Sequence, residues 1–515
     1  MKVLSRYVPV LITLLILVVV VVLFPSNVKP GLSQGYVFSG QLIPKSDAPG
    51  TKGITVGGYK CSFGLRQVPW SSYAPLCQPK FVGNNGGATS FGVTGKTITV
   101  TFRYAVPPQE ALILSIAKGV VGTEAQAVDT MKAYINLFNK DFELYGRHVV
   151  LKPFVGKGDF LQELSGLGQA GAQADAAEAK SLGAFADVSL LFSTAPYDQA
   201  LASNHIIAIT GGLYQGQSWF QENAPYVYST SPDCNEVGNA AAAVMKYSMA
   251  SLPAIFSNDP AMRVKQRVFG LIAPDNPIYQ ECANSTLKSL AQDHVFIKRV
   301  IGYNFNLTGA SQLSANAMAQ LQSAGVTTIL CACDPLTPVF LTGQAQKLGY
   351  YPEWFTIDWG DIFGQLVNPA EWSYAISGGT PGVPNSQNEA YQVLKMTGLP
   401  KKDWSPFYAS IYTPLLMLFD ALQAAGPNLN PYTFEAGFWS LPLSYAPSMG
   451  VWAFHKGSWV AQASYSILYW DPQALSPSND KKGAWEPCNN GKVYVYVDPT
   501  KGLKLHQQLQ CGDRG

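Results

Sequence analysis

The sequence predicts an α/β protein made of two similar lobes, each with a central, mainly parallel sheet. From Ile98 onward, apolar runs typical of strands alternate with amphipathic helical patterns, and such alternation is typical of parallel sheets with right-handed crossovers. The alternation restarts near residue 237. A chain of 515 residues is also too long for one hydrophobic core. We therefore expect two successive α/β units.

The first unit contains four strand-like runs with helical patterns between them. The runs cover 98–106, 149–155, 188–192 and 206–209. After the first run, Val128, Met131, Ile135 and Phe138 recur at helical spacing and predict one apolar helix face. An Ala-rich helix is expected over 169–182. Each of these helices connects two strands.

The second unit repeats this order. A helix over 237–251 leads to strands expected at 267–273, 296–302 and 327–331. The helix after the last of them ends at Gly349, with Pro352 beyond it as a stop signal. Later, Ile411, Leu415, Leu418 and Leu422 predict a long helix that ends at Gly426-Pro427. Short aromatic strands are expected at 451–454 and 465–470.

The first 96 residues differ from the rest. Lys2 and Arg6 precede an apolar run over 8–24, which is typical of a segment that directs export. Residues 1–25 are therefore expected to act either as a signal peptide or as a membrane anchor. Residues 26–96 are rich in Gly and Pro and predict a linker that contains a Cys-stapled loop and lifts the body off the membrane.

Eight cysteines follow residue 60, and an exported chain allows them to form disulfides. Cys61 with Cys77, and Cys488 with Cys511, each close a short loop and are predicted to pair. The other four, Cys234, Cys282, Cys331 and Cys333, allow three pairings that remain open. No His or Cys at ligand spacing accompanies Cys331 and Cys333, so no metal site is expected.

Composition and motifs argue against other classes of function. The net charge of +2 gives no electrostatic basis for binding nucleic acid. The five His form no metal or catalytic motif, and no nucleophile elbow, P-loop or dinucleotide fingerprint occurs. Asp358 and Asp361 could serve acid–base chemistry but equally a hinge. We expect no enzyme activity and no cofactor.

Several segments, which follow one another in the same order along the chain, resemble the branched-chain amino acid (Leu/Ile/Val)-binding family of ABC-type importers. The segments are 92–100, 135–136 with 145–147, 324–328 and 347–354, within a resemblance that extends from 92 to 498. Phe142 and Glu143 stand where that family has two Gly. The resemblance implies the type 1 periplasmic binding protein fold, in which two Rossmann-like lobes are joined by a hinge of three crossovers. Chain order would place these crossovers near Tyr228, Asp358 and Ala463.

The resemblance also implies a division of the chain and a function. Lobe 1 is expected to comprise 97–228 and 359–462, and lobe 2 to comprise 229–358 and 463–515. The protein would be a monomer that captures an amino acid, amide or aromatic-type small molecule at the extracytoplasmic face, anchored or secreted. It would deliver this ligand to an ABC-type permease and ATPase in separate chains. The alternative is a ligand-sensing ectodomain that acts through a separate signalling partner.

Ligands of doubly wound sheets bind beyond the carboxyl ends of the strands. From lobe 1, the predicted ligand-binding residues are Gln109, Glu110, Ser193, Thr194, Thr210, Gly211 and Gly212. From lobe 2, they are Asn276, Tyr279, Asp334, Asp358 and Trp359. By resemblance Tyr279 would be an aromatic lid, and Asp334 is the candidate to meet a ligand amine. For each Ser, Thr or Asn, capping of the following helix is the alternative.

Overall fold

The computed structural model describes most of the chain from residue 36 onward. The described residues are 36–38, 41–43, 52–62, 64–104, 122–189, 192–210, 215–304, 309–334, 336–357, 364–477 and 479–514. The apolar run at 8–24 lies outside them. Among the described helices, none is long and apolar enough to cross a membrane.

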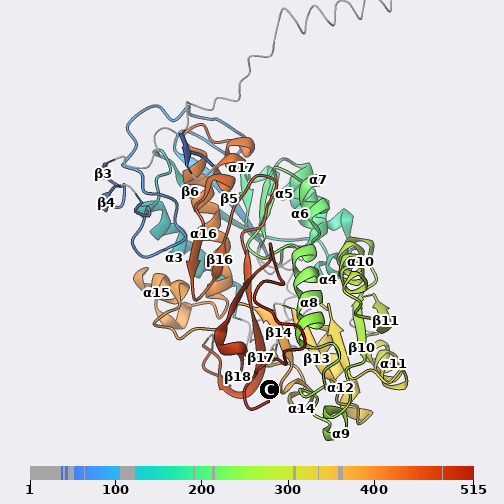
Figure 1. The fold of residues 1–515 in the computed structure, drawn as a ribbon. Helices are drawn as coiled ribbons and strands as arrows, with labels where there is room; N and C mark the ends of the chain where they lie inside the picture. The colour runs from blue at the N-terminus through green and yellow to red at the C-terminus, as the bar shows by residue number, and fades with distance from the viewer. Residues whose placement is uncertain are drawn as a thin grey trace, which may run out of the picture.

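A five-stranded parallel sheet with the order β6-β5-β7-β8-β9 forms the centre of the first lobe (Figure 1). Its strands are β5 (Thr97–Tyr104), β6 (His148–Val155), β7 (Ala186–Asp187), β8 (Ile207–Thr210) and β9 (Val227–Ser229). The connecting helices are α3 (Glu124–Asp141), α4 (Phe160–Leu164), α5 (Gln169–Ser181), α6 (Ala195–Ser203) and α7 (Gln217–Glu222). The predicted strand–helix alternation is confirmed here.

Local sequence signals explain where helix α3, which connects β5 to β6, begins. Thr123 and Gln126 form a capping box that satisfies backbone N–H groups at the start of α3. The predicted apolar face of this helix is buried. Strand β7 begins two residues earlier than expected and is short. Beyond its end, the backbone N–H of Arg103 on β5 donates to the Ser189 hydroxyl.

The second sheet has eight strands, with the order β11-β10-β12-β13-β14-β17-β18 and β19 paired to β17. The strands are β10 (Phe269–Pro274), β11 (Ile297–Tyr303), β12 (Thr328–Cys331), β13 (Glu353–Ile357), β14 (Ile376–Gly379), β17 (Ser464–Leu475), β18 (Lys482–Pro487) and β19 (Val493–Val495). β10 to β14 are parallel, and β17 to β19 are antiparallel additions. The helices with this sheet are α8 (Cys234–Ser248), α9 (Pro260–Arg263), α10 (Pro277–Gln292), α11 (Ala310–Ser323), α12 (Thr337–Lys347) and α14 (Pro369–Trp372).

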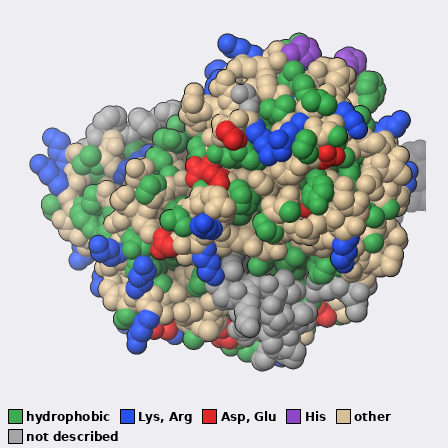
Figure 2. Space-filling model, turned by 90° about the horizontal axis from the view of Figure 1, so that it is seen from below, with side chains coloured by type: hydrophobic (Ala, Val, Ile, Leu, Met, Phe, Trp, Pro, Cys, Tyr) green, Lys and Arg blue, Asp and Glu red, His purple; other side chains and the backbone are tan. Residues whose placement is uncertain are grey.

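The face of the molecule seen from below carries basic and acidic side chains side by side (Figure 2).

One predicted boundary between the lobes is wrong. The second crossover was expected near Asp358, but β14 pairs with β13 and β17, so residues 376–379 belong to the second sheet. A fifth parallel strand at this edge buries Ile376 fully. The chain returns to the first lobe only afterwards, where α15 (Glu389–Met396) packs on α3 and α16 (Tyr408–Ala425).

The first and third crossovers lie side by side. The backbone N–H of Ser229 donates to the carbonyl of Trp459 at 2.9 Å, and the N–H of Ala461 donates to the carbonyl of Ser229 at 2.9 Å. Thr380, after β14, lies 3.5 Å from the amide of Gln462. These contacts bring all three chain crossings together.

The first lobe is completed by α16, whose buried residues occur on every side of the helix. A helix that is apolar all round is typical of a core position. It ends at Gly426, which has a φ of 80°, as the sequence predicts. Beyond it, α17 (Pro431–Ser440) and the hairpin β15 (Ser444–Ala446) with β16 (Gly450–Trp452) cover the same core.

The extension is not a free linker where it is described. Residues 52–96 lie against lobe 1 as a cap that contains the small hairpin β3 (Gly53–Ile54) with β4 (Lys60–Cys61). Tyr73 is 1% exposed, donates to the carbonyl of Gly450 at 2.5 Å and accepts from the N–H of Ala446 at 2.7 Å. Trp70 stacks on Phe138 of α3. Apolar residues spaced through the cap bury against the lobe, which a Gly- and Pro-rich composition does not reveal.

All eight cysteines are paired. The predicted bridges Cys61–Cys77 and Cys488–Cys511 are confirmed. The open pairing is resolved as Cys234–Cys282, which joins α8 to α10, and Cys331–Cys333, at the carboxyl end of β12.

Candidate ligand-binding cleft

The carboxyl ends of the two sheets face each other, and loops from both lobes touch there. Asn276, which follows β10, donates to the carbonyl of Ser165, which follows α4 of lobe 1. Ser218 on α7 donates to Glu281 on α10. Gly216 lies so close to the end of the Glu281 side chain that a Cβ there would be 2.1 Å from its carboxyl carbon. The structure therefore has the two lobes in contact around the predicted cleft.

A buried ionic network forms the lobe 1 side of this region. Arg103, at the end of β5, is 3% exposed and pairs with Glu163 at 2.9 Å and Asp175 at 3.1 Å. Its guanidinium also stacks 3.7 Å from the ring centroid of Tyr197. Because these partners take up the guanidinium, Arg103 is committed to the protein and is not a free counter-charge for a ligand carboxylate.

Two further carboxyls in the network form no ion pair within the described residues. Burial raises the pKa of Asp187 to about 6, against hydrogen bonds from Ser189, Thr101 and Tyr197 that lower it. Burial also raises the pKa of Asp198 well above its ordinary value. The Ser193 hydroxyl lies within hydrogen-bond distance of both Asp198 carboxyl oxygens, at 2.8 and 2.7 Å.

The predicted lobe 1 residues have different surroundings. Thr194 caps α6, because its hydroxyl accepts the N–H of Tyr197 and donates to Glu163. Ser193 is bonded to Asp198, as above. Thr210, at the carboxyl end of β8, is 1% exposed, and its hydroxyl has no hydrogen-bond partner within the described structure. Of these three hydroxyls, only that of Thr210 is left for a ligand.

Gln215 was not predicted from the sequence. It is 0% exposed, and neither atom of its side-chain amide has a partner in the part of the chain described. Its carbonyl accepts the N–H of Cys234 at 3.0 Å, while the carbonyl of Thr210 accepts the N–H of Thr230 at 3.1 Å. Both residues therefore flank the first crossover. The Gly–Gly sequence after β8 was the available signal, but a Gln five residues beyond a strand is ordinary.

On the lobe 2 side, Asn276 lies at the lobe contact as expected. Asp334 follows β12, but its carboxylate accepts the N–H groups of Leu336 and Thr337 and the hydroxyl of Tyr303. These bonds engage the carboxylate within lobe 2, and its contact with a ligand amine stays a prediction. Tyr279 lies in the first turn of α10. Gln109, Glu110, Gly211, Gly212, Asp358 and Trp359 lie outside the described residues.

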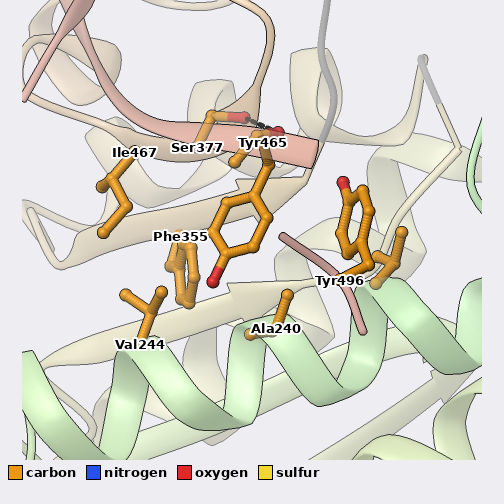
Figure 3. A pocket seen from close by; sticks show the side chains of 10 residues that line it. Ala240, Val244, Phe355, Ser377, Tyr465, Ile467 and Tyr496 are labelled. Atoms are coloured by element: carbon orange, nitrogen blue, oxygen red, sulfur yellow. Dashed lines mark hydrogen bonds between the residues drawn. The ribbon is translucent and has the colours of Figure 1, made fainter. Parts of the chain in front are cut away.

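A separate cavity lies inside lobe 2, between α8 and the sheet. It is lined by Val237, Ala240, Ala241, Val244, Phe355, Ser377, Gly378, Tyr465, Ile467 and Tyr496. Figure 3 shows the rings of Tyr465 and Phe355 pointing at Val244 and Ala240 of α8. This lining is that of a protein core. No group of His, Cys, Asp and Glu suited to a metal occurs among the described residues.

A family model described as periplasmic binding protein matches residues 166–473, more than half of the chain. The chain belongs to the periplasmic binding protein family. Its members work outside the cytoplasm, so the protein has an extracytoplasmic location. No curated protein matches the sequence.

Solved structures show the same fold. One is a fatty acid ABC transporter substrate-binding protein from Thermomonospora curvata, with a TM-score of 0.55 at 13% identity, covering 83% of this chain and 99% of that one. Another is a leucine-, isoleucine-, valine-, threonine- and alanine-binding protein from Brucella ovis in a closed conformation, with a TM-score of 0.53 at 13% identity, covering 79% and 97%. A third, from R. palustris, was solved with 4-hydroxybenzoate, with a TM-score of 0.54 at 13% identity, covering 76% and 96%. The predicted type 1 periplasmic binding protein fold is confirmed.

Proposed function

We propose that this protein captures a small molecule between its two lobes and delivers it to an ABC-type permease and ATPase carried by separate chains. The observation that carries this proposal is the pair of buried, unpartnered polar side chains beside the first crossover, Thr210 and Gln215. A buried polar group without a partner costs about 1–3 kcal/mol. A ligand that supplies a donor and an acceptor there would offset that cost.

Binding would act on the equilibrium between open and closed lobes. Contacts that a ligand makes with both lobes stabilise the closed arrangement, and only this differential affinity shifts the population. Loops at Ser165 and Gly216 already reach lobe 2 in this structure. A permease would recognise the closed form. No step in this cycle needs a catalytic residue, and we propose that the protein performs no turnover.

The ligand we propose is neutral, zwitterionic or cationic. Arg103 is already paired, and the other polar groups described at the cleft are hydroxyls, amides and carboxyls. The solved relatives were named for amino acids, fatty acids and 4-hydroxybenzoate, so the shared fold accepts varied ligands. An amino acid or amide satisfies both Thr210 and Gln215, because it offers donors and acceptors close together.

Thermal-shift screening of the full chain against metabolite panels tests the proposal. A ligand that binds only the folded state raises stability by about 2.7 kcal/mol at a hundred times its Kd. We expect Thr210→Val and Gln215→Leu to weaken the response to the identified ligand at least tenfold while leaving the unliganded melting temperature unchanged or raised. Thr342→Val is the matched control, since the Thr342 hydroxyl is buried but bonded within α12. A screen without any hit, or full binding by both cleft variants, would contradict the proposal.

We also propose that the protein stays at the outer face of the membrane through residues 1–25. Fractionation of cells that express the full chain distinguishes anchoring from secretion, because an anchored chain sediments with membranes and resists washing with salt.

A further inference from the structure

Basic and acidic residues are distributed unevenly along the chain. Residues 25–96 contain seven Lys and Arg and one acidic residue, Asp47. Residues 97–515 contain 26 basic and 32 acidic residues. The nearly neutral total of +2 therefore conceals a cationic N-terminal part and an anionic body. Such asymmetry points to an interaction with an anionic surface.

The structure gathers several of these lysines at one edge of the cap. Ile54 on β3 pairs in register with Lys60 on β4. The N–H of Lys80 donates to the Ile54 carbonyl at 2.9 Å, so this segment lies on the other side of Ile54. Lys52 and Val82 extend the same two segments by two residues each. We call these five residues the cap edge.

The cap edge combines charge with exposed apolar groups. All three lysines are exposed, and Ile54 and Val82 are 57% and 93% exposed. A lysine stem with apolar neighbours is suited to an interface where the ammonium meets phosphate and the methyl groups enter the acyl boundary. Scattered exposed apolar residues need no explanation, but here two of them stand between three cations.

Of the carboxyls nearest to this edge, that of Glu143 interacts electrostatically with Lys80 from beneath the cap. Asp141 and Glu143 lie beneath the cap, 6% and 2% exposed. Trp70 donates to Asp141 at 3.1 Å, and the N–H of Phe81 donates to Glu143 at 2.8 Å. Their hydrogen bonds hold the cap on lobe 1. On the face of the molecule seen from below, charges of both signs are mixed (Figure 2).

We propose that the cap edge is a docking surface for anionic lipid headgroups. Lys and Arg side chains near an anionic lipid surface are attracted by its negative surface potential. The cap follows the apolar run at 8–24, so an anchored chain would bring this edge to the bilayer. Because the cap is bonded to lobe 1, headgroup contact would hold the lobe in a set orientation at the membrane instead of lifting it away.

Lysine reactivity in the full chain tests this docking. The protein is reconstituted into bilayers that contain phosphatidylglycerol, and separately into phosphatidylcholine alone, and is treated with a water-soluble amine-acylating reagent. Mass spectrometry then measures the labelling rate at each lysine. We expect labelling of Lys52, Lys60 and Lys80 to be at least threefold slower in the anionic bilayer, with the protection lost in 0.5 M salt. Lys298 and Lys347, on β11 and α12 at the other end of the molecule (Figure 1), serve as internal references.

Two variants separate docking from a structural role. In Lys60→Gln/Lys80→Gln, protection of Lys52 should fall toward the neutral-bilayer rate, while the melting temperature stays unchanged. In Lys298→Gln/Lys347→Gln, protection should persist. Equal labelling in both bilayers would overturn the proposal. So would protection that resists salt or that requires a copurified protein, because either would assign the edge to a protein contact.

Discussion

At the scale of single residues, Glu371 provides the clearest pH prediction. It is 1% exposed, one carboxyl oxygen has no partner in the described chain, and burial raises its pKa from 4.5 to about 8. Because the folded protein holds the proton more tightly, its stabilising contribution is full below pH 4.5 and is lost as the pH rises toward 8. Glu371→Gln should remove this loss. Urea denaturation should show that the free energy of unfolding decreases less between pH 5 and pH 9 in the variant than in the unmodified protein. Equal decreases in the two proteins would contradict the prediction.

Residue-scale prediction from sequence succeeded where chain order alone sets the position. Thr210 and Asn276 were placed at carboxyl ends of strands, and the structure has them there. Asp334 was placed equally well, but its hydrogen bonds include one from Tyr303 on β11, which β10 separates from β12 in the sheet. Gln215 could not be found, because its missing partners are a property of the folded surroundings. Whether these residues bind ligand stays a prediction.

At the scale of elements, Tyr73 connects the cap to the hairpin of β15 and β16. Tyr73→Phe would leave the buried Gly450 carbonyl and the half-buried Ala446 N–H without that partner. We expect the free energy of unfolding to fall by about 1–3 kcal/mol. Tyr445→Phe is the control, since Tyr445 is 51% exposed. Equal urea midpoints for the two variants would show that this contact does not hold the cap.

Elements with a strong period were the most predictable. The strands that were predicted and α16 lie within a few residues of their expected positions, because alternation and helical spacing are local signals. Strands β9, β13, β14, β18 and β19 were not predicted. The cap was misread, since its turns are local but its packing on α3 and the hairpin is not. The same reason displaced the second crossover: β14 is too short to show that it belongs to the second sheet.

At the scale of the whole molecule, three crossovers and touching loops imply that the lobes move about one hinge. The neighbouring chain crossings at Ser229 and Ala461 leave little room for the lobes to slide, so rotation is the expected motion. The distant loops at Ser165 and Gly216 would then separate on opening. Any side chain that fills the contact between the lobes should favour the open form.

Gly216 is the place to insert one. Its backbone, with φ −73° and ψ 160°, accepts any residue, but a Cβ would lie 2.1 Å from the Glu281 carboxyl carbon. We therefore expect Gly216→Leu to keep the folded lobes intact, to weaken ligand binding at least tenfold and to raise the radius of gyration of the ligand-saturated protein. Gly343→Leu on α12 is the control, because nothing lies within 4 Å of a Cβ there. Calorimetric titration and small-angle scattering measure both effects, and unchanged affinity together with an unchanged radius would show that closure does not pass through this contact.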